Sequence, residues 1–272
     1  MSTAIETPTY HLHQGSVPLL ISIPHLGTSI PAPFRELYTD EALQTGDSDW
    51  HLDQVYAVAR SLGASLLGAK VSRYIVDLNR PPGGESLYPG QNTTGLCPLT
   101  TFHGNPLYKD GCAPDAAEIQ RRVETYWTPY HQALQAEIER LRAQHGQVLV
   151  WEAHSIASVI PRLFDGKLPD LNFGTNGGIS CDPQLFAAAT APLQAAPGFS
   201  HVVNGRFKGG YNTRHYGQPG RGVHTIQLEM CQSLYMNEAY PYEYREVTAQ
   251  PVQKLIGEML GAGLAYLSSR AK

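Results

Sequence analysis

The sequence has little that would direct it to a membrane or to nucleic acid. Its longest apolar runs, such as residues 17–23, are far shorter than the ~20 residues that a membrane-spanning helix needs. The formal net charge of -4 gives no basic footprint, so we expect no nucleic-acid partner. The first residues also lack a basic segment followed by an apolar one. We therefore expect neither a membrane span nor a secretory signal.

Cysteine is scarce, with four residues among 272 and no CxxC pair. The four are scattered along the chain: Cys97, Cys112, Cys181 and Cys231. This scatter argues against a disulfide framework and against a zinc site built from thiolates. Metal ligands, if the protein needs them, would come from the eleven histidines instead. The composition predicts a cytoplasmic protein, either a monomer or a small homo-oligomer.

Internal repeats, low-complexity tracts and linkers are also missing, and the apolar pattern alternates between strand and helix. Helical spacing predicts helices at 49–63, 114–146, 182–196 and 252–269, with Pro129 expected to kink or split the second. Short apolar runs predict strands at 17–23, 64–78 (one strand or two), 147–153, 201–204 and 223–230. This order predicts one α/β domain over 1–272, a three-layer α/β/α fold with a mixed, mainly parallel sheet. Residues 1–15 are the part expected to be loosely attached.

Polar side chains stand at the ends of four predicted strands. In an open α/β sheet, ligands bind outside the carboxyl ends of the strands. One such ending would be unremarkable, whereas four converging endings predict a site. The residues are His25 after the first strand, Asp77, Asn79 and Arg80 after the second, Glu152 and His154 in "WEAHS", and Glu229 in "QLEM".

Two histidines and one carboxylate, with a fourth position left open, make a catalytic zinc site. His25 and His154 are the natural nitrogen ligands, and Glu229 is the candidate general base. Each residue alone also has an ordinary structural role, since Asp49 before a predicted helix is by default an N-cap. The spacing leaves the oxygen ligand open among four carboxylates: Asp47, Asp49, Asp53 and Glu152.

Arg80 with Asn79 is the best candidate for an anion clamp, because a guanidinium holds a carboxylate in bidentate fashion. Arg73, two strand periods before Asp77, is expected to pair with it structurally.

The connection 204–222 is rich in glycine and cations. Its Arg206, Arg214 and His215 are candidates to bind an acidic substrate or to stabilise an oxyanion, whereas Lys208 is expected on a solvated surface. Residues 90–108 form a second long connection that could be a lid or a pocket wall.

Several segments in order resemble one family. They are "PLLISIPHLGTSIP", "SDWHLDQVY", "SRYIVDLNRP", "WEAHSI", "NGRFKGGYNTRHYG" and "IQLEMCQSLYM". Together they closely resemble the N-formylglutamate amidohydrolase (N-formylglutamate deformylase) family of histidine degradation. The resemblance extends from about residue 17 to about residue 238 without large gaps.

The resemblance implies a hydrolase that uses one divalent metal ion, zinc by preference, and a fold related to the zinc carboxypeptidases. By this likeness the metal ligands are His25, Asp49 and His154, and Glu229 is the catalytic glutamate. Asn79 and Arg80 resemble the pair with which carboxypeptidases hold a substrate carboxylate. "WEAHS" departs from the "DAHS" typical of the family, and Glu152 and Ser155 are expected to support His154 from behind.

These inferences predict the hydrolysis of N-formyl-L-glutamate to formate and L-glutamate. Arg206 or Arg214 would hold the second carboxylate, and Arg214 or His215 would stabilise the oxyanion. One alternative is another N-acyl amino acid deacylase or a carboxypeptidase of the same fold. The other is a metal-free protein that binds an acidic ligand.

Overall fold

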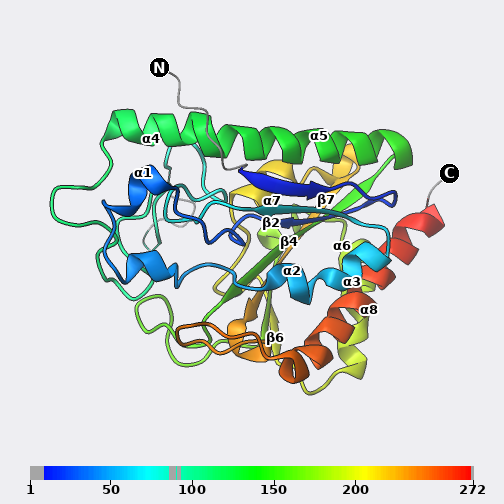
Figure 1. Cartoon of the computed structure of the whole chain (residues 1–272). Coiled ribbons are helices and arrows are strands. Elements are labelled where there is room, and N and C mark those ends of the chain that lie inside the picture. Colours follow the sequence, from blue (N-terminus) through cyan, green and yellow to red (C-terminus); the bar gives the residue numbers. More distant parts are fainter. Residues whose placement is uncertain (1–8, 86–89, 91–92, 271–272) are drawn as a thin grey trace.

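The structure, a computed structural model, describes residues 9–85, 90 and 93–270 (Figure 1). These residues form a seven-stranded sheet with the order β1-β3-β2-β4-β7-β5-β6. Its strands are β1 (Tyr10–His13), β2 (Leu19–Ile23), β3 (Ser65–Ala69), β4 (Val148–Ile156), β5 (Leu171–Gly174), β6 (His201–Val203) and β7 (Val223–Cys231).

The four central strands of the sheet, β3, β2, β4 and β7, run parallel to one another. On one side β1 is antiparallel to β3, and on the other β5 is antiparallel to β7 while β6 is parallel to β5. Every residue of β2, β4 and β7 is buried. Burial on both faces explains their near-continuous apolar sequences. The prediction of a mixed, mainly parallel sheet is confirmed.

Helices cover both faces of this sheet. The helices are α1 (Ala32–Arg35), α2 (Leu52–Val55), α3 (Ala57–Ser61), α4 (Ala116–Arg122), α5 (Thr128–His145), α6 (Pro183–Thr190), α7 (Tyr211–Tyr216) and α8 (Glu246–Arg270). Short 3-10 turns add η1 (Ala42–Gln44), η3 (Asn176–Gly178), η4 (Ala191–Ala195), η5 (Pro219–Arg221) and η6 (Gln232–Leu234). Figure 1 shows α5 along one side of the sheet and α2, α3, α6 and α8 on the other, which gives three layers.

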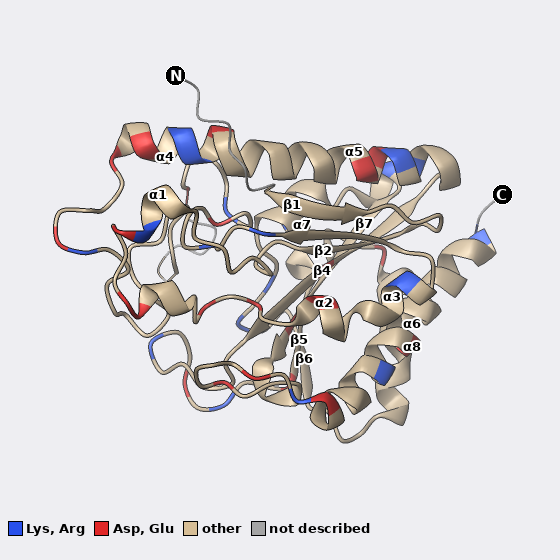
Figure 2. Ribbon diagram, viewed as in Figure 1, with Lys and Arg blue, Asp and Glu red and all other residues tan. Residues whose placement is uncertain are grey.

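Charged residues lie mostly in the helices and in the connections, and the central strands carry few of them (Figure 2). All four cysteines are unpaired, as their spacing predicts. Among the described residues, no helix combines the length and the apolar character needed to cross a bilayer.

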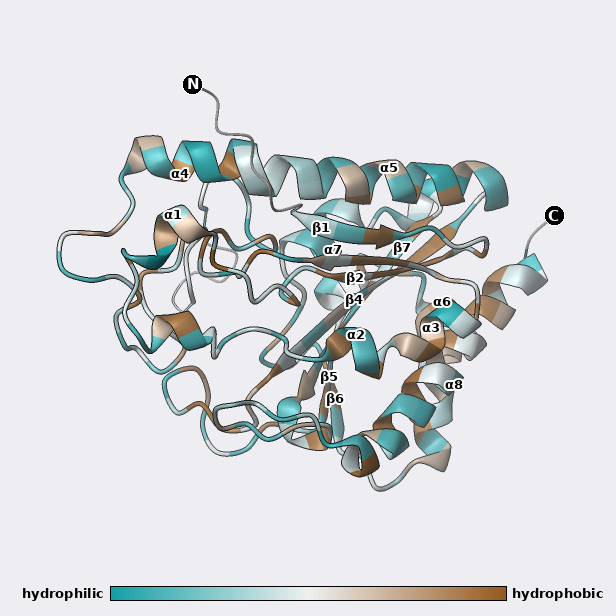
Figure 3. Ribbon diagram, in the orientation of Figure 1, coloured by the Kyte–Doolittle hydropathy of each residue, from teal (hydrophilic) through white to brown (hydrophobic). Residues whose placement is uncertain are grey.

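Alternation along β4 divides the core into two clusters. Leu149 and Trp151 face α8, whereas Val148 and Val150 face α5, and the hydropathy colouring in Figure 3 marks the apolar strands between the helices. The indole Nε1 of Trp151 donates to the hydroxyl of Tyr56 at 2.9 Å. Since side chains alternate along a strand, Glu152 and His154 point to the same face of β4 as Val148 and Val150.

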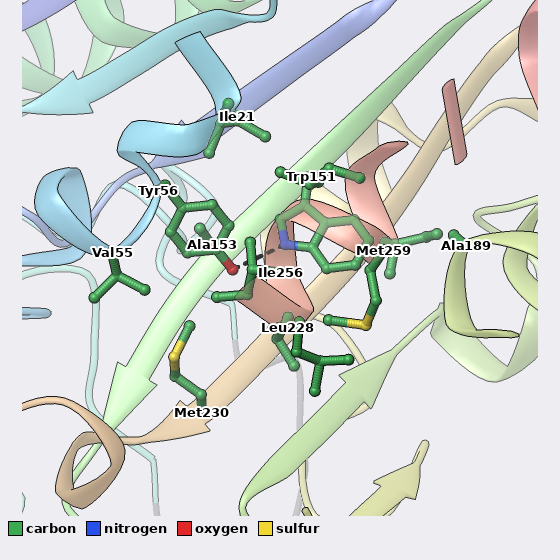
Figure 4. Packing of buried hydrophobic residues seen from close by; sticks show 14 of the residues in the cluster. Ile21, Val55, Tyr56, Trp151, Ala153, Ala189, Leu228, Met230, Ile256 and Met259 are labelled. Atoms are coloured by element: carbon green, nitrogen blue, oxygen red, sulfur yellow. Dashed lines mark hydrogen bonds between the residues drawn. The ribbon is translucent and has the colours of Figure 1, made fainter. Parts of the chain in front are cut away.

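Met259 of α8 packs beside the indole ring of Trp151 and is fully buried (Figure 4). Met259→Ala should therefore lower the free energy of unfolding by about 2–5 kcal/mol, measured by urea denaturation. Lys254→Ala on the same helix removes an exposed side chain and should change it by no more than about 0.5 kcal/mol. Equal effects of the two substitutions would contradict this account of the core.

Three details of the predicted elements are wrong. The strand predicted at 64–78 ends at Ala69, because the following backbone turns away and bonds to other loops: Ser72 N donates to Ser29 O and Asp77 N to Leu96 O. Within residues 1–15, strand β1 is an ordered edge of the sheet rather than a loose segment, while residues 1–8 lie outside the described part. The helix predicted at 49–63 is divided into α2 and α3.

The long helical stretch predicted at 114–146 does not break at Pro129. Helix α4 passes through a π-helical turn, η2 (Val123–Trp127), directly into α5. Figure 1 shows the two helices as one rod. Proline has no N–H to donate, and the wider turn immediately before it accommodates the missing backbone bond.

Candidate active site

A cavity opens at the carboxyl ends of the parallel strands, where Figure 1 shows the longest connections. It is the place that the polar strand endings predict. Seven residues singled out from the sequence line it: His25, Asn79, Arg80, His154, Ser155, Arg206 and Glu229.

The parallel strands bring these side chains together. His154 on β4 lies directly opposite Glu229 on β7 in the strand register. His25 follows β2, the neighbour of β4 on its other side. Asp49 reaches the same place from the connection after η1, and its backbone N–H donates to the carbonyl of His25 at 2.9 Å. Residues far apart in the sequence thus meet at one edge of the sheet.

His25, Asp49 and His154 form a buried cluster in which one ligand atom from each lies within 4.8 Å of the others. Asp49 Oδ2 is 3.2 Å from His154 Nδ1 and 3.8 Å from His25 Nδ1. The two imidazole rings have centroids 4.9 Å apart. Two imidazoles and one carboxylate form the donor set of a catalytic zinc site.

The second oxygen of Asp49 supports the presence of a cation. Asp49 Oδ1 is buried and has no hydrogen-bond partner among the described residues. A buried carboxylate oxygen without a partner is costly, and a divalent metal ion would satisfy it. The residues present therefore fit a metal ion.

The other three carboxylates that the sequence left open lie elsewhere. Asp47 Oδ2 accepts from the backbone N–H of Phe102 at 2.8 Å, and Asp53 is exposed on α2. Glu152 is fully buried beneath the cavity. Its Oε2 accepts from Ser22 Oγ at 3.1 Å and from Asn212 Nδ2 at 3.2 Å. Burial raises the pKa of Glu152 to about 7.

Behind His25 lies an ion pair. His25 Nε2 is 2.7 Å from Asp77 Oδ1, and Arg73 Nη2 donates to Asp77 Oδ2 at 2.6 Å. A carboxylate on the far nitrogen of a ligating histidine fixes the ring and its tautomer. Burial opposes ionisation of Asp77, but Arg73 and His25 hold the pKa of that carboxyl well below its usual range.

The expected pairing of Arg73 with Asp77 is confirmed. The sequence did not predict that this pair lies at the cavity beside His25. Arg73 Nη1 lies 3.1 Å from His25 Nδ1, and the guanidinium lines the cavity. The four-residue spacing of the pair could be read from the sequence. Its contact with His25 could not, because it depends on how the segment after β3 turns back toward β2.

His154 is supported from its other side by Asn79, whose Nδ2 lies 3.1 Å from His154 Nε2. Asn79 Oδ1 accepts from the backbone N–H of Asn212 at 3.0 Å. Burial lowers the pKa of His154, but the hydrogen bond and the charge of Asp49 outweigh it, and the net shift is upward. The neighbouring Ser155 Oγ accepts from Tyr235 OH at 2.6 Å.

Glu229 is buried at the wall of the cavity beside this cluster. Burial and the negative charge of Asp49 raise its pKa, against the opposing effect of His154. A carboxyl that is neither salt-bridged nor fully solvated is suited to accept a proton and to return it.

The predicted cations divide into two groups. Arg80 and Arg206 line the cavity, where Arg80 Nε donates to Thr94 O at 2.9 Å and Arg206 Nε to Leu163 O at 3.0 Å. Arg214 and His215 lie on α7 and are not among the lining residues. Arg214 Nε donates to Gly209 O at 2.9 Å, and the exposed His215 stacks on Tyr211.

The helical rod holds the segment that carries Asn79 and Arg80. Three of its side chains donate to backbone carbonyl groups of that segment. The pairs are Arg122 Nη1 with Ile75 O at 3.1 Å, His131 Nε2 with Leu78 O at 3.0 Å and Trp127 Nε1 with Arg80 O at 3.0 Å.

Comparison with known proteins places the chain among relatives of one family. Residues 17–236 match the family model described as N-formylglutamate amidohydrolase. The chain is 51% identical over 258 residues to an N-formylglutamate deformylase of Pseudomonas putida, covering 95% of this chain and 96% of that protein. It is also 51% identical over 253 residues to an N-formylglutamate deformylase of Pseudomonas aeruginosa, with 93% and 95% covered.

Solved structures show the same fold. An N-formylglutamate amidohydrolase from Ralstonia eutropha superposes with a TM-score of 0.81 at 25% identity, covering 96% of this chain and 99% of the other. A gene product of Agrobacterium tumefaciens gives a TM-score of 0.73 at 19% identity, with 98% of each chain covered. The match to the family model and the close relatives lead to one conclusion: the chain belongs to the N-formylglutamate amidohydrolase family.

Proposed function

We propose that the protein is a metal-dependent deformylase that hydrolyses N-formyl-L-glutamate to formate and L-glutamate. The observation that carries the proposal is the buried His25, Asp49 and His154 cluster beside Glu229 in an arginine-lined cavity. The two relatives at 51% identity are both named N-formylglutamate deformylase. The resemblance further implies the last step of a histidine degradation route, and the unpaired cysteines fit a cytoplasmic location.

His25, Asp49 and His154 would hold the metal ion. When bound, a zinc ion polarises a carbonyl group and lowers the pKa of water to about 7. Asp77 keeps the His25 ring in place, and Asn79 does the same for His154.

Glu229 performs the proton transfers. It takes a proton from the attacking water as the new bond to the formyl carbon forms. It then gives that proton to the nitrogen of glutamate as the carbon–nitrogen bond breaks. Negative charge develops on the formyl oxygen in between, and Arg73 is the cation that both lines the cavity and contacts His25. The reaction consumes one water and leaves formate and glutamate.

Arg80 and Arg206 bind the two substrate carboxylates. A site that pairs partly buried cations with these groups rejects analogues that lack them. The formyl group is small, so most of the recognition falls on the amino acid part of the substrate.

Formate release from N-formyl-L-glutamate by the purified protein tests the proposal directly. N-acetyl-L-glutamate and N-succinyl-L-glutamate are assayed in parallel. We expect release of formate and little hydrolysis of the larger acyl groups. Preferential hydrolysis of either larger substrate would instead support a different deacylase of the same fold.

Arg80→Ala should raise KM for N-formyl-L-glutamate by about 10- to 100-fold, because a hydrogen bond to a charged group is lost. KM should change less for the analogue that lacks the carboxylate held by Arg80, which is either N-formyl-L-glutamine, without the side-chain carboxylate, or 4-formamidobutanoate, without the α-carboxylate. Arg142→Ala is the matched control, since Arg142 pairs with Glu139 on the surface of α5. An equal rise in KM for N-formyl-L-glutamate and for both analogues would show that Arg80 does not bind a substrate carboxylate.

A further inference from the structure

Gln227 is a cavity residue to which the mechanism above gives no role. It lies on β7 two residues before Glu229, on the same face of the sheet, and lines the cavity although its side chain is only 3% exposed. Its Oε1 accepts from the backbone N–H of Gly210 at 2.8 Å and from Thr213 Oγ1 at 3.3 Å.

These contacts fix the orientation of the amide. A backbone N–H can only donate, so the oxygen of Gln227 must face Gly210 and the nitrogen must face the other way. Gly210 packs closely on Asn79, since a Cβ at this position would lie 2.3 Å from Asn79 Nδ2. Gln227 therefore presents only hydrogen-bond donors to the cavity.

The amide nitrogen lacks a partner of its own. Within the part of the chain that the structure describes, Gln227 Nε2 makes no hydrogen bond, whereas Oε1 makes two. The nitrogen is not sealed off within the protein interior, and Gln227 lines the cavity, so Nε2 can donate to a ligand that supplies an acceptor. A role limited to anchoring the 209–210 backbone would need only the oxygen and would leave the nitrogen unexplained.

We propose that Gln227 Nε2 donates to a carboxylate oxygen of the substrate. This inference rests on the proposed function and adds a specificity-determining residue to it. The formyl group must lie against Glu229 to react, and residues two apart on a strand are separated by about 7 Å. That separation places the donor at the amino acid part of the substrate rather than at the reacting carbon.

Fixed donor geometry gives the site a preference that arginines alone do not provide. Because its oxygen is occupied, Gln227 cannot rotate to accept a hydrogen bond from a ligand. A substrate with an ammonium or amide N–H at this position would meet an unmatched donor. Gln227 therefore selects for an acceptor oxygen.

The test compares three substrates. N-formyl-L-glutamine lacks the side-chain carboxylate and 4-formamidobutanoate lacks the α-carboxylate, whereas N-formyl-L-glutamate has both. Gln227→Met keeps the length of the side chain and removes the donor. We expect kcat/KM for N-formyl-L-glutamate to fall by about 30-fold or more, mainly through KM. The ratio of kcat/KM for N-formyl-L-glutamate to kcat/KM for one of the two analogues should fall by at least about tenfold. The carboxylate that this analogue lacks is then the one that Gln227 binds.

Thr225→Val is the matched control. Thr225 lies on the same face of β7, two residues further from Glu229, and its hydroxyl donates to Thr213 O, which also accepts from Gly217 N. The Thr225→Val variant should keep kcat/KM for all three substrates within about twofold of the wild-type values. Gln227→Leu serves the same test if Gln227→Met does not fold, as judged by thermal melting.

A uniform loss for all three substrates, or no loss, would overturn the assignment of Gln227. A wild-type protein that releases no formate from N-formyl-L-glutamate would instead reject the proposed function itself. The two failures are therefore distinguishable.

Discussion

Glu229→Gln should lower kcat for formate release by about 1000-fold or more while leaving KM within a few-fold. The substitution keeps the shape of the side chain and removes its ability to accept a proton, and a positioned general base contributes about 100- to 10000-fold. Glu229 lies beside the candidate metal-binding cluster of His25, Asp49 and His154 without being one of its three members. The loss should therefore appear in the chemical step. Steady-state kinetics with N-formyl-L-glutamate measure it.

Two controls accompany that measurement. The metal content of Glu229→Gln should equal that of the wild type, because none of its ligands changes. Glu258→Gln alters an exposed glutamate on α8 that pairs with Lys254, and it should retain full activity. Full turnover by Glu229→Gln would refute the role of Glu229 as the general base.

Removal of the metal ion is the second change for which we expect a nearly complete loss. Dialysis against a chelator should reduce formate release to the background rate, and one equivalent of zinc should restore it. Thermal melting gives a readout independent of activity. A ligand that binds only the folded state stabilises it, and the unpaired Asp49 Oδ1 is relieved when the ion binds. The melting temperature should therefore fall with chelation and recover with zinc.

The variant His154→Ala identifies the site of this effect. It should abolish both the activity and the response of the melting temperature to zinc, whereas His145→Ala, at the end of α5 and before the amino end of β4, should retain both, because His154 lies near the opposite end of that strand. Undiminished activity after complete removal of metal would leave the cluster without a catalytic metal. A wild-type melting temperature that does not respond to zinc would argue that His25, Asp49 and His154 do not bind it.

The sequence predicted the parts of the fold that depend on continuous burial. Strands β2, β4 and β7 are buried along their whole length and carry apolar runs, so their positions and polar endings could be read directly. His25, His154 and Glu229 follow from those endings, and the structure brings them to one cavity. Asp49 could not be selected over its rivals from spacing alone, because the connection after η1 folds back on His25 through a backbone contact.

The remaining features depend on tertiary contacts. Strand β5 has four residues and an antiparallel pairing with β7, too short for a clear periodic signal. In the sequence, Gln227 is one more residue of a predicted buried strand. Its role depends on the hydrogen bond from Gly210 N, which orients the amide and which the sequence does not indicate. Asp77 and Arg73 read as a local pair, because nothing in their spacing indicates His25. His215 has the chemistry for the site, but it lies on an exposed part of α7.

The π-helical turn η2 has a consequence for the phase of the helical rod. In an ordinary α-helix, residues five apart point in directions about 140° apart, because each residue turns the chain by about 100°. In a π-helical turn, the bonding of each residue to the fifth one along brings such residues onto the same face. Arg122 and Trp127 are five apart, and both reach the segment that carries Arg80. Ordinary winding of the same residues would rotate one of these two donors away and loosen the clamp, whereas loss of one residue from η2 would leave the donors four apart and about 40° from alignment, so it should be tolerated.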